Sequence, residues 1–338
     1  MLYWVPIEPI EERYSRQWWV WFNKEFEKKR IPHRGIMGQN ITTKIEKGSF
    51  LDICGTHYWK SSQIARISDL IHRGIVEDGD WFLFGDMWFP GLEALAYMRD
   101  ALGIKIKIAG ILHAGSYDPY DRLAAWNTEI WAKSLEESWF AAVDLIFVAT
   151  NFHKKLLTEN RDVDPSKIRV TGFPIYDEWS NADVKKENIL LFPHRLDPEK
   201  QPHLFDELIR RITEPPGWKF FRSKDLCKTK KEYYDLLNRS KISISFALQE
   251  TWGIAMQESV ISGCLPIVPN RLSYEEMYFP VFRYDTMKES REMAIEFMSN
   301  GQAYQEELQI QRGIILENGA KAIHNMLLEM QLVRKETK

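Results

Sequence analysis

The sequence predicts an α/β protein of two domains, each built on a parallel β-sheet. Short apolar runs alternate with amphipathic segments along the 338 residues, which is the order that strand-helix-strand units produce. The series begins again after a polar, turn-rich stretch at residues 173–188. A chain of this length also exceeds one ordinary domain and gives each of two domains its own core.

The first domain is expected over residues 1–178. Apolar runs with the length and composition of strands lie at residues 1–7, 49–54, 80–86, 106–113 and 145–150. Helical periodicity separates them, over Tyr14–Arg30, Ser61–Arg73, Pro90–Leu102 and Asn127–Ala142. This alternation is typical of a Rossmann-like, doubly wound domain.

The second domain is expected over residues 179–318, followed by a C-terminal helical segment at residues 319–338 that packs on either domain. Its strands are predicted at residues 189–195, 218–223, 242–247, 264–269 and 280–285. Helices are predicted from Gln201, over Lys230–Asn238, from Gly253, and from Tyr304 to Arg334. The second domain therefore repeats the Rossmann-like pattern of the first.

Composition excludes several classes of protein. Hydrophobic residues make up 44% of the chain and charged residues 28%, and no apolar run approaches the roughly 20 residues of a membrane-spanning helix. The first residues lack the pattern of a secretory signal, and the three cysteines lie far apart, which favours a reducing compartment over disulfides or a zinc site. We therefore expect a cytoplasmic protein without membrane insertion. The net charge of −3 gives no general attraction to nucleic acid, although a local basic patch is sufficient for binding.

Polar residues after the strands of the second domain mark a candidate ligand site, because parallel sheets bind ligands beyond the carboxyl ends of their strands. Arg195 follows one predicted strand, and Lys200 stands where the next helix should begin. Two cations beside a helix N-terminus suit an anion such as a diphosphate. A solvated loop with ordinary surface charges explains the same pair, and for these two residues alone it is the more frequent case.

The stretch Gln249–Val268 adds two glutamates with seven residues between them. Glu250 leaves a predicted strand, and Glu258 is expected in the second turn of the next helix, facing the ligand site. Two carboxylates there can hold hydroxyl groups of a sugar and of a ribose, and Gly253 lets the backbone approach a ligand closely. In the alternative interpretation, Glu250 caps the helix and Glu258 is a solvated helix residue.

Together these residues resemble a known family. The order Arg195–Lys200, Glu250, seven residues, Glu258 and Gly263–Pro266 resembles the retaining nucleotide-sugar glycosyltransferases of the GT-B fold, with their E-x-x-x-x-x-x-x-E signature. The resemblance covers roughly residues 165–285. It implies two Rossmann-like domains facing a cleft, and a nucleotide-sugar donor, most often a UDP-sugar, with no further cofactor. It also implies transfer with retention of configuration and without a metal.

The resemblance also implies roles for the site residues. Arg195 and Lys200 are implied to bind the donor diphosphate and to stabilise its departure. Glu250 is implied to contact the donor sugar and Glu258 the ribose, with help from backbone N–H groups at the start of the second helix. No Asp-x-Asp-like pair follows a strand to hold a divalent cation. The implied donor-site residues are Arg195, Lys200, Glu250, Gly253, Ile254 and Glu258.

The first domain is implied to bind the acceptor, and there the sequence departs from the family. Residues 5–18 (VPIEPIEERYSRQW) stand where the family has a glycine-rich loop. His113 directly follows a strand, where family members often carry a histidine near the reacting sugar, so it is a candidate catalytic residue, although such a histidine is more often structural. Asp86, Trp88 and Phe89 follow another strand and are candidate acceptor contacts or core residues.

Several classes of acceptor stay open. The opening, residues 7–22 (IEPIEERYSRQWWVWF), is similar to phage-encoded glycosyltransferases that decorate hydroxymethylated pyrimidines in DNA. Basic stretches at Lys24–Arg34 and Lys224–Lys231 would then contact the phosphates of duplex DNA, although such runs are usually solvated faces. The first candidate acceptor is therefore a 5-hydroxymethylpyrimidine such as 5-hydroxymethylcytosine in bacteriophage DNA, modified in the host cytoplasm. A glycan, a protein or a small metabolite is the alternative, and the same fold also serves sugar epimerases and silent binding modules.

Overall fold

The structure is a computed structural model that describes residues 1–41, 52–125, 129–213 and 215–334. The chain divides into two compact units. Residues 1–174 and the C-terminal residues from 321 onward form the first unit, and residues 175–320 form the second. The sequence-based division placed the boundary after residue 178 and began the C-terminal segment at residue 319.

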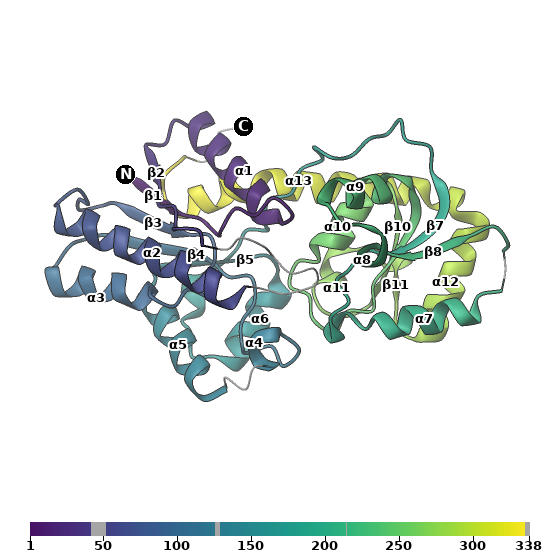
Figure 1. The fold of residues 1–338 in the computed structure, drawn as a ribbon, viewed down its shortest axis with the longest axis horizontal. Coiled ribbons are helices and arrows are strands. Elements are labelled where there is room, and N and C mark those ends of the chain that lie inside the picture. Colours follow the sequence, from purple (N-terminus) through teal and green to yellow (C-terminus); the bar gives the residue numbers. More distant parts are fainter. Residues whose placement is uncertain (42–51, 126–128, 214, 335–338) are drawn as a thin grey trace. The chain divides into compact units, whose positions relative to one another are not determined.

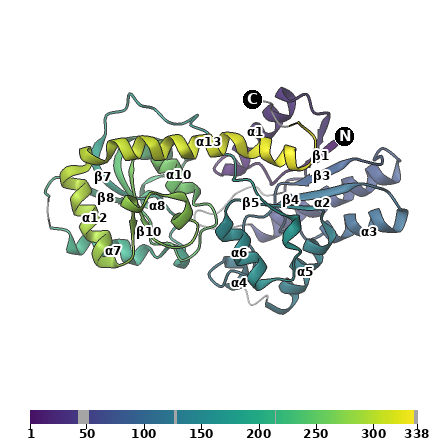
Figure 2. The same cartoon turned by 180° about the vertical axis from the view of Figure 1, so that it is seen from behind.

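A six-stranded parallel sheet forms the centre of the first unit, in the order β2-β1-β3-β4-β5-β6 (Figure 1). The strands are β1 (Leu2–Val5), β2 (His33–Gly35), β3 (Trp81–Phe84), β4 (Lys107–Ile111), β5 (Leu145–Val148) and β6 (Ile168–Val170). Helices lie on both faces of this sheet (Figures 1 and 2). They are α1 (Tyr14–Lys28), α2 (Ile53–His72), α3 (Leu92–Leu102), α4 (Arg122–Ala125), α5 (Glu129–Ala142) and α6 (Asn151–Asn160).

The last residues of one predicted strand of this unit were wrong, and four of its strands and α-helices were not predicted. Residues 52–54 lead into α2 instead of forming a strand, because the Asp52 carboxylate accepts the Gly55 N–H at 3.0 Å and caps the helix. The rest of that stretch, like the predicted start of α5 at Asn127, lies outside the described residues. The strands β2 and β6 have three residues each, too few to produce an alternation, and the helices α4 and α6 were also missed.

The tryptophan-rich opening packs as an aromatic cluster between β1 and α1. Trp4 is 1% exposed, and its ring stacks on Phe22 with centroids 4.4 Å apart. Its strand neighbours Tyr3 and Val5 belong to the core on the opposite face of the sheet, as the alternation of a strand requires. The opening of the chain thus forms an internal strand of the first unit's sheet, between β2 and β3.

A five-stranded parallel sheet forms the centre of the second unit, in the order β11-β10-β9-β7-β8. Its strands are β7 (Glu187–Phe192), β8 (Lys219–Arg222), β9 (Ser240–Ile244), β10 (Leu265–Pro269) and β11 (Arg283–Tyr284). The helices are α7 (Pro202–Arg211), α8 (Ser223–Leu226), α9 (Lys230–Arg239), α10 (Ile254–Ile261), α11 (Tyr274–Met277), α12 (Met287–Asn300) and α13 (Gln305–Glu329). Short 3-10 helices complete the chain: η1 (Pro165–Lys167), η2 (Pro198–Lys200), η3 (Pro280–Phe282) and η4 (Gly301–Tyr304).

The strand order of the second unit reverses direction at β7. The chain places β8 on one side of β7 and then β9 on the other, so the loops that follow β7 and β9 diverge at the carboxyl edge of the sheet, where ligands bind in such folds. Leu190 and Phe192 face one apolar cluster, and Ile189 and Leu191 face another. A strand buried on both faces explains the continuous apolar run at this position.

The last helix, α13, has residues in both units: those up to 320 belong to the second unit and those from 321 to the first. In the first unit, the guanidinium of Arg169 in β6 pairs with the carboxylate of Glu329 at 2.6 Å. Neither α13 nor any other helix in the described part of the chain has the length and apolar character needed to cross a membrane.

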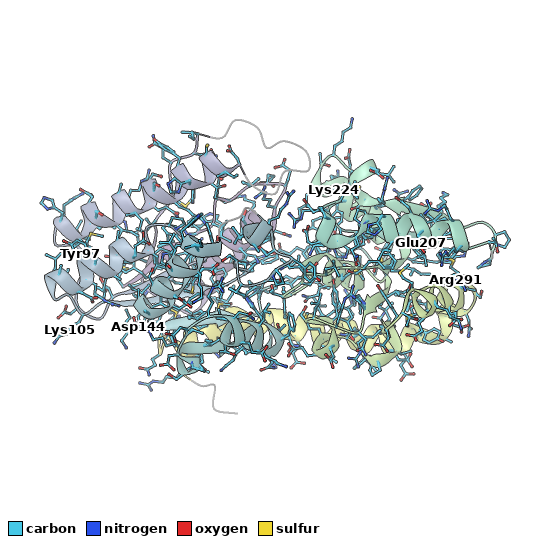
Figure 3. All side chains as sticks on the ribbon, turned by 90° about the horizontal axis from the view of Figure 1, so that it is seen from below. Tyr97, Lys105, Asp144, Glu207, Lys224 and Arg291 are labelled. Atoms are coloured by element: carbon cyan, nitrogen blue, oxygen red, sulfur yellow. The ribbon has the colours of Figure 1, made fainter. Side chains whose placement is uncertain are left out.

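The aromatic cluster predicts a large effect of truncating Trp4. We expect Trp4→Ala to lower the free energy of unfolding by about 3–5 kcal/mol, because it leaves a cavity beside Phe22. The control is Tyr97→Ala on α3 (Figure 3), where the side chain is 73% exposed and the expected change is within about 0.5 kcal/mol. Urea unfolding measures both variants, and equal losses would contradict this packing.

Candidate functional site

A buried ion pair lies at the point where the strand order of the second unit reverses. Lys200 ends η2 after β7, and Glu250 lies in the loop after β9; Lys200 Nζ is 3.0 Å from Glu250 Oε1. Lys200 Nζ also donates to the Gln249 carbonyl oxygen and, at 3.2 Å, to Gln249 Oε1. The lysine side chain is 6% exposed. The fold thus brings together two residues that are fifty positions apart in the sequence.

The carboxylate of Glu250 keeps its charge in this setting. Burial on its own raises the pKa of Glu250, but the charge of Lys200, the proximity of His194 and the hydrogen bond from Lys200 outweigh burial, and the net pKa is lower than usual. Glu250 is therefore ionised at neutral pH. Because a carboxylate has about four acceptor positions, it can hold Lys200 and still accept hydrogen bonds from hydroxyl groups of a ligand.

His194, which follows β7, is a third member of this cluster that sequence reasoning missed. Its Nδ1 lies 3.7 Å from Glu250 Oε1, and its buried Nε2 has no hydrogen-bond partner among the described residues. Burial, opposed by the charge of Glu250, lowers the pKa of His194 to about 3, so the ring is neutral at pH 7. Its position directly before Arg195, after a buried strand, was the available signal.

Arg195 lies at the edge of the cluster and is paired with two acidic residues. Its Nη1 is 3.3 Å from Asp197 Oδ2, and its Nη2 is 3.1 Å from Glu199 Oε1. The arginine side chain is 31% exposed. An incoming anion must therefore share the guanidinium with these carboxylates or displace them.

Gly253 opens α10 and has two reasons to be glycine. Its φ of 65° lies in the left-handed region, and a Cβ at this position would be 2.8 Å from Tyr274 Cε1. The hydroxyl group of Tyr274 is in turn 3.1 Å from Ser245 Oγ, which follows β9. The turn between Glu250 and Ile254 therefore packs closely against Tyr274.

Glu258 lies in the second turn of α10 and is 4% exposed. The Tyr234 hydroxyl donates to Glu258 Oε1 at 2.9 Å, and Lys230 Nζ is 3.5 Å from the same oxygen. The solvated-helix interpretation of Glu258 was therefore wrong. Both partners come from α9. Sequence reasoning considered Lys230 only as a phosphate contact in the basic stretch Lys224–Lys231, and it did not identify Tyr234.

In the first unit, His113 follows β4 and has a partner on each ring nitrogen. Its Nε2–H donates to the Gly85 carbonyl oxygen at 2.8 Å, and its Nδ1 is 3.4 Å from the Tyr14 hydroxyl. The rings of Trp18 and Phe173 lie 4.9 and 5.1 Å away. Burial lowers the pKa of His113, so the ring is neutral at pH 7.

The candidate acceptor residues Asp86 and Trp88 are held within the first unit. Asp86 pairs with Lys60 at 2.8 Å and accepts the Trp88 backbone N–H at 3.0 Å. The Trp88 indole N–H donates to Glu136 at 3.0 Å, and Glu136 pairs with Arg161 at 2.7 Å. An acceptor that binds Asp86 must therefore compete with Lys60.

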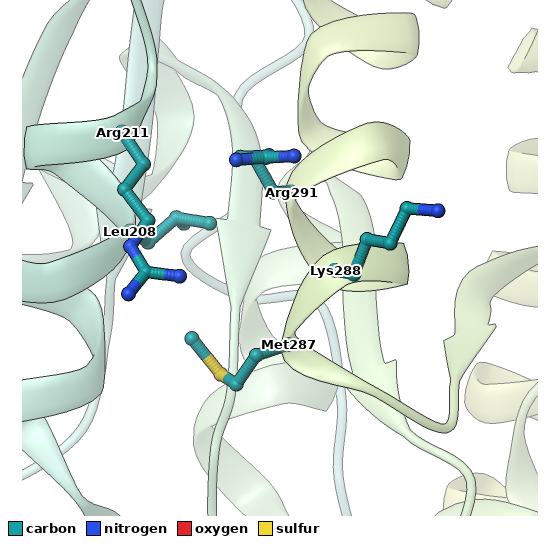
Figure 4. A pocket seen from close by; sticks show the side chains of 5 residues that line it. All are labelled: Leu208, Arg211, Met287, Lys288 and Arg291. Atoms are coloured by element: carbon teal, nitrogen blue, oxygen red, sulfur yellow. The ribbon is translucent and has the colours of Figure 1, made fainter.

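A pocket in the second unit lies apart from these residues. A pocket of 270 Å³ between α7 and α12 is lined by Leu208, Arg211, Met287, Lys288 and Arg291 (Figure 4). It includes none of the site residues predicted from the sequence, and Arg211 in it pairs with Glu207 at 2.7 Å.

Within the described ranges, no group of three or more His, Cys, Asp or Glu side chains is arranged to hold a metal ion.

Comparison with known sequences gives a partial match. No protein-family profile matches the chain. The chain is 26% identical over 164 residues to the tRNA-queuosine alpha-mannosyltransferase of Drosophila melanogaster, over 37% of this chain. The match spans 43% of the length of that relative.

Solved structures are similar over nearly the whole chain. Sucrose-phosphate synthase from Thermosynechococcus elongatus matches with a TM-score of 0.71 at 8% identity, over 98% of each chain. The chain has the GT-B fold. Anabaena HepE in complex with UDP and glucose matches with a TM-score of 0.63 at 10% identity, over 98% of this chain and 99% of that one. The GT-B fold confirms the α/β class predicted from the sequence, with two Rossmann-like units.

In this GT-B chain, substituting Gly253 should be costlier than substituting another glycine of positive φ. Gly217 has a φ of 84° and open space around its Cβ position, so Gly217→Ala adds only about 1–2 kcal/mol of backbone strain. Gly253→Ala adds the contact with Tyr274 to a similar strain. We expect the greater loss of unfolding free energy for Gly253→Ala in urea titrations. Equal losses would show that the Tyr274 ring moves aside without a cost in stability.

His194 predicts a dependence of stability on pH. The pKa of His194 is about 3 in the folded chain, whereas an unfolded histidine has a pKa of about 6.5. Between these values the unfolded state binds more protons, so the free energy of unfolding falls as pH falls, by up to about 1.4 kcal/mol per pH unit. His194→Gln should reduce this slope between pH 6.5 and 5 in urea titrations, and an unchanged slope would exclude a buried neutral His194.

Proposed function

We propose that the chain is a retaining glycosyltransferase that moves a sugar from a nucleotide-diphosphate sugar to an acceptor hydroxyl group. The buried Lys200–Glu250 pair carries this proposal, since it combines a cation for a diphosphate with a carboxylate for sugar hydroxyls at the ligand-binding edge of the sheet. A UDP-sugar is the first candidate donor, supported by the similarity to HepE, which was solved with UDP and glucose.

The residues of the proposed donor site have different roles. Lys200 and Arg195 bind the diphosphate and stabilise the charge that develops as it leaves. Glu250 accepts hydrogen bonds from the donor sugar, and Glu258 accepts them from the ribose. In this proposal, backbone N–H groups near Gly253 and Ile254 add to the positive end of α10. These are the roles that the family resemblance implies, carried to residues of the second unit.

The proposed reaction needs no protein base. The bond between the anomeric carbon and the donor phosphate oxygen breaks, and its electron pair leaves with the diphosphate. The acceptor oxygen attacks from the same face, and its proton passes to a donor phosphate oxygen. We assign His113 a contact to the reacting sugar instead of proton transfer, because its ring nitrogens already contact Gly85 and Tyr14 and burial lowers its pKa.

The proposed acceptor is a hydroxyl group on a modified nucleoside within a nucleic acid. A 5-hydroxymethylpyrimidine in DNA is the first candidate, supported by the resemblance of residues 7–22. A nucleoside in RNA is the second, favoured by the relative whose name places its substrate in tRNA. Tyr120 and Trp131 in the first unit are 52% and 50% exposed, and aromatic side chains of this kind stack on unpaired bases.

A mass measurement tests the proposed function. The protein is incubated with UDP-, GDP- and ADP-sugars and, separately, with a DNA duplex containing 5-hydroxymethylcytosine, a plain duplex, or a tRNA pool, and the nucleic acid is then digested to nucleosides. We expect a gain of one sugar mass on the hydroxymethylated duplex only. A gain on tRNA alone would move the acceptor to RNA. Conversion of the donor without any acceptor would instead indicate an epimerase.

Glu250→Gln should lower kcat/KM for transfer by about 100-fold or more, because it removes the charge paired with Lys200 and weakens the hydrogen bonds to the sugar. Glu296→Gln, at an exposed position of α12, is the matched control and should keep wild-type kinetics. Thermal unfolding of both variants checks that they fold. Full activity of folded Glu250→Gln would remove Glu250 from the donor site.

A further inference from the structure

Two contacts of Glu258 come from one face of α9, and Tyr233 beside them on the same helix also interacts with its carboxylate. Lys230 and Tyr234 are one helical turn apart, so their side chains lie on the same side of the helix. Tyr234 donates to Glu258 Oε1 at 2.9 Å, while Lys230 Nζ lies 3.5 Å from that oxygen and 5.2 Å from the centre of the Tyr234 ring. The contacts from Lys230 and Tyr234 both use Oε1, and about half of the carboxylate's acceptor positions are on the other oxygen.

The Tyr234 ring is itself fixed by the segment that precedes β7. The indole of Trp179 stacks on it with centroids 4.7 Å apart and an interplanar angle of 9°. Asn238 on α9 donates to the Trp179 carbonyl oxygen at 2.9 Å and accepts the Asn181 N–H at 3.1 Å. Trp179 is therefore held against α9 by its backbone as well as by its ring.

This arrangement is more than a way to satisfy a buried carboxylate. Tyr234 and Lys230 turn Oε1 toward α9, so the orientation of the carboxylate plane is fixed before any ligand arrives. A carboxylate that is already oriented loses less entropy when it accepts hydrogen bonds from a vicinal diol. Tyr234 therefore acts on ligand binding through Glu258 without contacting the ligand.

We propose that Tyr234 is a positioning residue that orients Glu258 to bind the ribose hydroxyls of the donor nucleotide, and that Trp179 keeps Tyr234 in place. This inference rests on the proposed function, because it assumes a nucleotide at the second unit. Its consequence is selectivity: the chain distinguishes ribonucleotide from 2′-deoxyribonucleotide donors through a tyrosine that touches neither.

Calorimetric binding of UDP, GDP and ADP and of their 2′-deoxy counterparts tests this inference. For the nucleotide that binds, we expect the wild-type chain to prefer the ribose form by roughly tenfold, as one hydrogen bond to a charged group provides. Tyr234→Phe should weaken the ribose form by roughly five- to tenfold and the 2′-deoxy form by less than about twofold. The preference for ribose should therefore fall from about tenfold to between about one- and fourfold.

Tyr304→Phe is the matched control, because Tyr304 also donates to a glutamate, Glu296, at 3.3 Å in the same unit, but through a hydrogen bond exposed to solvent. It should bind both forms as the wild type does. If Tyr234→Phe does not fold, Trp179→Leu replaces it, with an expected loss of roughly threefold in the ribose preference.

The outcomes separate this inference from the proposed function. A folded Tyr234→Phe variant that keeps the full ribose preference, or that binds both forms equally more weakly, overturns the role of Tyr234. It does not contradict the proposed donor site. A wild-type chain that binds nucleotides without preferring ribose overturns the role of Glu258. A wild-type chain that binds none of the nucleotides overturns the proposed function, and the role of Tyr234 with it.

Discussion

The ion pair between Lys200 and Glu250 is the constraint on which the site of the second unit depends. Two opposite charges in a nearly closed environment are stable only when each satisfies the other. The pair therefore fixes the spacing of the loop after β7 relative to the loop after β9. His194 beside the pair stays neutral because burial makes a further, unpaired charge costly, which lowers the pKa of its ring.

Much of the fold could be predicted because its strands are buried on both faces. Continuous apolar runs such as Ile189–Phe192 are unambiguous, and their alternation with helices indicates a parallel sheet. The elements that were missed, such as β2 and β6, have no such signal: they are too short, and tertiary pairing alone makes them strands. The start of α2 was mistaken for a strand because a capping aspartate determined the local structure more strongly than the apolar pattern.

Only some residues of the candidate site could be predicted from the sequence. Residues with a fixed spacing, such as Lys200, Glu250 and Glu258, could be identified from the sequence. Their partners His194 and Tyr234 could not, because their contacts depend on how β7 and α9 approach the loops of β9 and α10, which spacing does not encode. In the first unit, the sequence suggested that Asp86 was open to an acceptor. The structure pairs it with Lys60, twenty-six residues earlier.

The return of the chain to its first unit affects how the protein is made. Residues from 321 onward belong with residues 1–174, and Arg169 finds its partner Glu329 one hundred and sixty residues later. During synthesis, domains usually fold in order from the N-terminus. Here the first unit leaves the ribosome without its final helical turns and completes its contacts only after the second unit has been translated. A ribosome that stops anywhere in the last helix therefore releases an N-terminal unit that is incomplete, even though its strands β1 to β6 have all been made.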